Sequence, residues 1–137
     1  MIPKPLARQF GRVLLMDDDE AIRLTAAALL QRLGVEAVPV DDGAQVLREY
    51  AAARAAGRPY DLVILDLTVP GGMGGRETME QLLRMDPQVR ALVSSGYSSD
   101  PVLAHYRAHG FLGLVPKPYD IEELARVIHA ALKGEAD

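Results

Sequence analysis

Residues 62–67 read LVILDL, an apolar run that ends in a carboxylate. A short apolar run of this kind is typical of a strand buried on both faces of a parallel sheet. The same pattern occurs upstream, where residues 13–19 read VLLMDDD. Two buried strands that each end in acid predict a parallel sheet with an acidic carboxyl-terminal edge.

Strand and helix signals alternate five times along the chain. The expected strands are residues 13–16, 35–40, 62–65, 91–94 and 111–115. Apolar residues at helical spacing follow each strand; Gly34 ends the first helix, and Asp120 begins the last, with Glu123 completing a capping box. We therefore predict an α/β fold, a doubly wound five-stranded parallel sheet with five helices and right-handed crossovers. Pro39 indicates either that the second strand lies at a sheet edge or that the strand ends there.

Length and composition predict one globular domain without a redox or membrane role. The chain has 137 residues, a net charge of -4 and no cysteine. An acidic chain is poorly suited to direct nucleic-acid binding, and the absence of cysteine excludes disulfides and thiolate metal sites. No apolar run reaches the length of a membrane span, and the start lacks a signal peptide, so we expect a soluble, cytoplasmic protein without membrane insertion. We interpret residues 1–11 as an arm or linker, 12–134 as the domain and 135–137 as a tail.

Polar residues at the carboxyl ends of the strands form the expected site, because ligands bind at this edge of an open parallel sheet. The candidates are Asp17, Asp18, Asp66, Ser95 and Lys117. Clustered carboxylates repel one another unless a cation or a proton intervenes, and Mg2+ prefers such oxygen ligands. Asp66 can act as a nucleophile toward phosphorus, with Lys117 and the metal stabilising charge on the transferred group and Ser95 donating a hydrogen bond.

The motifs at these positions resemble those of the receiver domain of two-component response regulators. The resemblance rests on VLLMDDDE at residues 13–20, LVILDL at 62–67, VSSG at 93–96 and PKP at 116–118, and it extends over about residues 11–133. Four motifs in the right order are specific, whereas one alone would be weak.

The resemblance implies a flavodoxin-like fold with strand order 2-1-3-4-5. It implies that Asp66 is phosphorylated from a phosphohistidine of a histidine kinase or histidine phosphotransfer protein. It also implies a Mg2+ ion held by Asp17, Asp18, Asp66 and the backbone carbonyl of Thr68, with Ser95 and Lys117 on the phosphate. Such a domain is not an enzyme with a catalytic output; it dephosphorylates itself, switches a protein-interaction surface, and in some cases forms a homodimer on phosphorylation.

Some positions depart from the common receiver pattern. DLTVPGGMGG at residues 66–75 is one residue longer than the usual loop, a variant that resembles the C-terminal receivers of hybrid sensor histidine kinases. Leu114 stands where a switch aromatic is common, and Tyr97 is a candidate substitute. The sequence leaves open whether the chain is a stand-alone regulator or part of a hybrid kinase.

Other interpretations of these residues are less favoured. The acids at 17–19 could cap the first helix, although one acid suffices. The glycines at 71, 72, 74 and 75 are expected to permit a tight loop with positive φ values rather than to bind phosphate. His105 and His109, at i and i+4 on the expected fourth helix, are a weak metal pair because no carboxylate accompanies them.

Two other functions share part of this site. A hydrolase of the haloacid dehalogenase type needs a second acid two residues after its nucleophile, where this chain has Thr68. A binding-only scaffold, such as a flavin binder, would not need the complete acidic and basic set.

Overall fold

The computed structural model describes residues 11–96 and 101–133. The strands are β1 (Arg12–Met16), β2 (Glu36–Val40), β3 (Leu62–Asp66), β4 (Ala91–Ser95) and β5 (Gly113–Pro116). The helices are α1 (Glu20–Arg32), α2 (Gly43–Ala55), α3 (Gly75–Met85), α4 (Pro101–Ala104), the 3-10 helix η2 (Tyr106–His109) and α5 (Ile121–Lys133). None of the helices in these ranges is long and apolar enough to cross a lipid bilayer.

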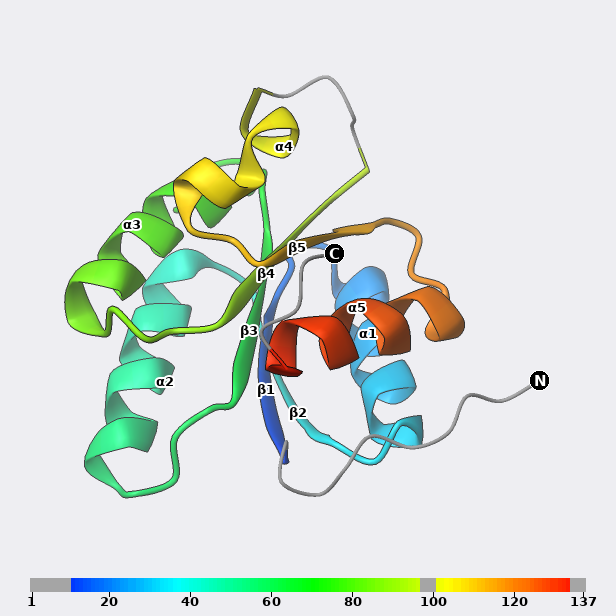
Figure 1. Ribbon diagram of the computed structural model, residues 1–137, viewed down its shortest axis with the longest axis horizontal. Helices are drawn as coiled ribbons and strands as arrows, with labels where there is room; N and C mark the ends of the chain where they lie inside the picture. Colours follow the sequence, from blue (N-terminus) through cyan, green and yellow to red (C-terminus); the bar gives the residue numbers. More distant parts are fainter. Residues whose placement is uncertain (1–10, 97–100, 134–137) are drawn as a thin grey trace.

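The five strands form one parallel sheet in the order β2-β1-β3-β4-β5, as predicted. Figure 1 shows α2, α3 and α4 on one face of this sheet and α1 and α5 on the other. The strand that contains Pro39 lies at an edge, where a residue without a backbone N–H is tolerated. The topology places the carboxyl ends of β1, β3, β4 and β5 at the same edge of the sheet.

Two hydrophobic cores hold the helices against the sheet. Side chains alternate along each strand, so Leu14, Val63 and Val93 pack toward α2 and α3, whereas Leu15 and Ile64 pack toward α1 and α5. β3 and β4 are buried along their whole length, because helices cover both faces of the sheet. The segments that end these strands are consequently fixed in place.

Local capping sets the ends of the helices. Asp120 accepts a hydrogen bond from the backbone N–H of Glu123 at 3.1 Å, which confirms it as the first residue before α5. Gly34 follows the end of α1 with a φ of 90°, a conformation that glycine adopts without steric cost.

The connection between β4 and β5 differs from the prediction. The expected long fourth helix is instead the short α4 followed by η2, and His105 between them has a non-helical φ of -128°. The pairing of His105 and His109 on one helix was therefore wrong. Phe111 does not begin β5, since its backbone N–H bonds to the carbonyl of Tyr106 and its side chain enters the core beside α3 and α4. The predicted helix start at Asp100 lies outside the described residues.

A hydrogen bond between Tyr50 and Asp86 joins α2 to the end of α3 and makes stability depend on pH. The Tyr50 hydroxyl donates to Asp86 Oδ2 at 2.7 Å. Burial by itself would raise the pKa of Asp86, but the hydrogen bonds from Tyr50 and from the backbone N–H of Gln88, together with the charge of Arg54, outweigh this and lower it. A lowered pKa in the folded state contributes stability above the unfolded pKa, about 3.9, and this stability is lost as the pH falls through the folded value.

We predict that Tyr50→Phe lowers the free energy of unfolding by about 1 kcal/mol at pH 7, as expected for one hydrogen bond. The difference between wild type and variant should shrink as the pH falls below 4, because protonated Asp86 no longer favours this bond. Urea unfolding at pH 7 and at stepwise lower pH measures the difference. A difference that stays constant with pH would contradict the assignment, and Tyr106→Phe serves as the matched control.

Candidate functional site

The polar residues predicted from the strand ends meet at one edge of the sheet. Met16 and Leu65 are register partners, so Asp17 and Asp66, which follow them, lie side by side. Asp66 itself is the register partner of Ser94 on β4. Parallel pairing therefore brings acids that are far apart in the sequence into one cluster.

The three consecutive acids after β1 have different roles. Asp19 is the N-cap of α1, accepting a hydrogen bond from the N–H of Ile22 at 3.1 Å. Asp17 is buried and accepts from the N–H of Asp19 at 2.9 Å, whereas Asp18 is exposed. The helix-cap interpretation thus applies to Asp19 and leaves Asp17 and Asp18 for other chemistry.

The carboxylates of Asp17, Asp18 and Asp66 are close enough to share a cation. One oxygen from each lies within 4.8 Å of the others. Asp17 is 0% and Asp66 3% exposed, so water screens their mutual repulsion only weakly. Oxygen ligands from carboxylates, together with water and phosphate, are what Mg2+ takes in proteins, and this donor set fits it.

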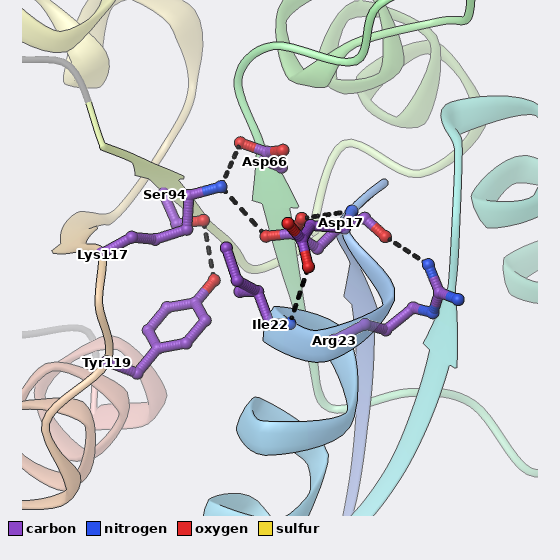
Figure 2. A network of polar contacts seen from close by, with 8 residues as sticks. Asp17, Ile22, Arg23, Asp66, Ser94, Lys117 and Tyr119 are labelled. Carbon is purple, nitrogen blue, oxygen red and sulfur yellow. Dashed lines mark hydrogen bonds and ion pairs between the residues drawn. The ribbon is translucent and has the colours of Figure 1, made fainter.

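Lys117 extends from the loop after β5 into the same cluster. Its Nζ lies 3.0 Å from Asp17 Oδ2 and 3.1 Å from Asp66 Oδ1, and its side chain is 13% exposed. Figure 2 shows the amino group between the two carboxylates. The peptide bond from Lys117 to Pro118 is cis. A cation is thus already placed beside the Asp66 carboxylate.

Electrostatics at Asp66 follow from this arrangement. Burial raises the pKa of Asp66 to about 6, repulsion from Asp17 acts in the same direction, and Lys117 opposes both. Burial alone would lower the pKa of Lys117, but its hydrogen bond to Asp17 and the charge of Asp66 raise it above the usual value. At neutral pH, Asp66 is therefore an ionised carboxylate beside a permanent cation.

The cluster opens into a cavity of about 240 Å³ at the surface. Thr68 and Ser95 line it together with the acids and Lys117. Thr68 is exposed, whereas Ser95 is buried at the end of β4. The cavity gives a small donor access to Asp66 from solvent.

The glycine-rich loop after β3 was predicted only in part. Of its four glycines, Gly71 alone has a positive φ, 76°. Gly74 and Gly75 are needed for close packing: a Cβ on Gly74 would lie 2.6 Å from the carbonyl oxygen of Leu67, and one on Gly75 would lie 2.8 Å from that of Asp66. Small residues here let the start of α3 pack against the backbone of the phosphoacceptor candidate.

Two contacts at the site were not predicted. Arg23 donates to the backbone carbonyl of Asp17 at 2.9 Å, and the hydroxyls of Ser94 and Tyr119 are 2.8 Å apart. The sequence does indicate that Ser94 and Ser95 differ in their surroundings, because neighbouring side chains on a strand point to opposite faces of the sheet. Tyr97 lies outside the described residues, and Leu114 lines a separate cavity beside Ser95.

Comparison with known proteins identifies the family. The family model described as the response regulator receiver domain matches residues 13–129. The chain belongs to this family. Receiver domains act in two-component phosphorelay signalling, and they are not catalytic output domains.

Similar receiver domains occur in sensor kinases and in regulators. The chain is 29% identical to the CAI-1 autoinducer sensor kinase/phosphatase CqsS of Vibrio cholerae, over 95% of this chain and 18% of that protein. It is 27% identical to the DNA-binding transcriptional regulator NtrC of Escherichia coli K12, over 90% of this chain and 25% of that protein. The structure of Vibrio cholerae chemotaxis protein CheY4 is 25% identical, with a TM-score of 0.78 over 89% of this chain and 98% of that one. The chain thus spans a quarter or less of the length of these two curated relatives.

Proposed function

We propose that Asp66 is the phosphoacceptor of this receiver domain and takes its phosphoryl group from a phosphohistidine. The observation that carries the proposal is the position of Lys117, whose Nζ contacts Asp66 and Asp17 at 3.1 and 3.0 Å. A purely structural ion pair would not need the third carboxylate, Asp18, exposed beside it. Acids, cation and access to solvent together suit phosphoryl transfer.

Mg2+ is the proposed cofactor, held by Asp17, Asp18, Asp66 and the backbone carbonyl of Thr68. Bound there, it would neutralise charge on the phosphoryl oxygens. The carboxylates that would hold it are already in place, with Asp17 fixed by its hydrogen bond from the N–H of Asp19. Thr68 supports the assignment because it lines the same cavity.

The transfer step forms a bond between a carboxylate oxygen of Asp66 and phosphorus. The P–N bond to the donor histidine breaks, and the departing imidazole keeps its electron pair and takes up a proton. Lys117 pairs with the transferred phosphoryl oxygens in place of Asp66, and Ser95 donates its hydroxyl to another of them. In self-dephosphorylation, a water molecule attacks the phosphorus of phosphorylated Asp66 and the carboxylate is regenerated. Water would reach the site through the cavity that the exposed Thr68 lines.

The proposed partner is a histidine kinase or a histidine phosphotransfer protein in the cytoplasm, with no direct nucleic-acid contact. We further propose that the receiver occupies residues 12–134, between an arm at 1–11 and a tail at 135–137. Support comes from β1, which begins at Arg12, and α5, which ends at Lys133. Phosphorylation would switch an interaction surface. As a separate proposal, the phosphorylated protein forms a homodimer, which light scattering would detect as a doubled molar mass.

We predict that incubation with acetyl phosphate or phosphoramidate in Mg2+ adds one phosphoryl group, and that EDTA prevents the addition. Without the metal, charge on the incoming group meets three carboxylates, so the rate should fall by at least about 100-fold. Intact mass spectrometry measures the adduct, and peptide mapping locates it. Hydroxylamine should remove the group, because it cleaves acyl phosphates and not phosphoserine. An adduct that forms equally in EDTA, or that maps away from Asp66, would contradict the proposal.

A further inference from the structure

A partly buried hydrogen bond ties the loop that carries Lys117 to the strand beside the phosphoacceptor. Ser94 is 0% exposed and is the register partner of Asp66. Its Oγ lies 2.8 Å from the hydroxyl of Tyr119, which comes two residues after Lys117. Figure 2 shows the Tyr119 ring directed from the loop toward Ser94, beneath the Lys117 amino group.

We infer that Tyr119 is a positioning residue for phosphoryl transfer, acting through Ser94 to fix the backbone from which Lys117 reaches Asp66. The inference rests on the proposed function and goes beyond it, because the two hydroxyls hydrogen-bond to each other and not to the carboxylates of the acidic cluster.

The contacts form a continuous series that begins and ends at Asp66. Asp66 pairs with Ser94 across the sheet, Ser94 bonds to Tyr119, the chain leads back from Tyr119 to Lys117, and Lys117 Nζ returns to Asp66. One further anchor holds this loop near the strand, the N–H of Lys117 bonded to the carbonyl of Ser95 at 3.2 Å. Tyr119 thus fixes the far side of the lysine, across Pro118.

Fixing the backbone is useful because the lysine side chain must move. Before transfer its amino group contacts two carboxylates, and during transfer it must follow the phosphoryl oxygens instead. A fixed backbone limits this change to side-chain torsions and keeps the amino group within reach. Misplacement of a charge-stabilising group by about 1 Å can reduce a rate up to about 100-fold.

Burial makes the hydroxyl pair specific rather than incidental. The Tyr119 ring is half-buried and packs against the core formed with α1 and α5, and the Ser94 hydroxyl is enclosed in the sheet. A buried hydroxyl without its partner is unfavourable, so the two side chains hold each other in one arrangement. Removing the tyrosine hydroxyl therefore loosens the attachment of the whole loop to β4, and does not only free the ring of Tyr119.

The test compares initial rates of Asp66 phosphorylation by phosphoramidate at saturating Mg2+. Tyr119→Phe keeps the ring and is expected to lower the maximal rate about tenfold, within the range for a displaced group, with Mg2+ affinity unchanged. Ser94→Ala should match it, and the double variant should be no slower than either single variant. Tyr106→Phe, which removes a hydroxyl outside the cavity, is the matched control.

The Lys117→Met background separates positioning from a general structural effect. If Tyr119 acts through Lys117, Tyr119→Phe should cause no further loss in that background. Hydrogen exchange gives a readout that needs no phosphoryl transfer: the Lys117 amide should exchange faster in Tyr119→Phe.

Three results would overturn the inference. These are a wild-type rate in Tyr119→Phe, an equal tenfold loss in the Lys117→Met background, or unchanged exchange at Lys117. Each of them would leave the proposed function intact, provided that wild type is phosphorylated on Asp66. If wild type forms no adduct, both proposals fail together.

Discussion

Asp66→Asn is expected to abolish the Mg2+-dependent phosphoryl adduct. The amide has nearly the shape of the carboxylate but no nucleophilic anion, so no bond to phosphorus can form. The variant should fold, because Asp66 is buried beside Asp17 and the substitution relieves their repulsion. Intact mass after incubation with phosphoramidate and Mg2+ measures the effect directly.

Asp41→Asn is the matched control for this experiment. Asp41 follows β2 at the same edge of the sheet, is exposed, and pairs with the side chain of Gln45 outside the cavity. It should be labelled as fully as wild type. Labelling of Asp66→Asn at the wild-type level would refute the assignment of Asp66, whatever the state of the metal site.

Lys117→Met is expected to slow phosphorylation of Asp66 by about 100- to 1000-fold, the usual loss when one preorganised charge-stabilising group is removed. Methionine retains most of the length of the side chain and loses the charge. The rate constant at saturating donor and Mg2+ is the quantity to measure. Lys133→Met removes an exposed lysine at the end of α5 and should leave the rate unchanged.

Lys117→Met should also lower the free energy of unfolding in metal-free buffer. Asp17 and Asp66 are buried, and without Lys117 their charges lose the partner at 3.0–3.1 Å. Breaking a buried ion pair typically costs on the order of 3 kcal/mol, and added Mg2+ should restore part of it. Urea unfolding with and without Mg2+ tests this. A variant that is less stable but reacts as fast as wild type would show that Lys117 is only a structural cation.

The variants Asp66→Asn and Lys117→Met distinguish the role of the nucleophile, Asp66, from that of the charge-stabilising cation, Lys117. The first should leave no adduct on Asp66 at any time, whereas the second should form the same adduct slowly. Adduct formation that is slow and incomplete in both would point to a second acceptor.

Local sequence determined most of the fold. The apolar runs at residues 13–16 and 62–65 became β1 and β3, and the acids that end them lie at the predicted edge. The segment after β4 was harder to predict, because His105 leaves the helical conformation and Phe111 turns into the core instead of extending β5. These choices depend on how the connection packs against α3, which spacing along the chain does not encode.

The sequence by itself determined which residues stand at the strand ends, because an apolar run followed by a polar residue is a local pattern. It therefore identified Asp17, Asp66 and Lys117 as candidates. Only the tertiary structure decided how they meet: Lys117 contacts Asp17 across 100 positions and Asp66 across 51, and Ser94 meets Tyr119 across 25. Such contacts depend on the order and register of the strands, and a buried hydroxyl or amine finds its partner only when the sheet has formed around it.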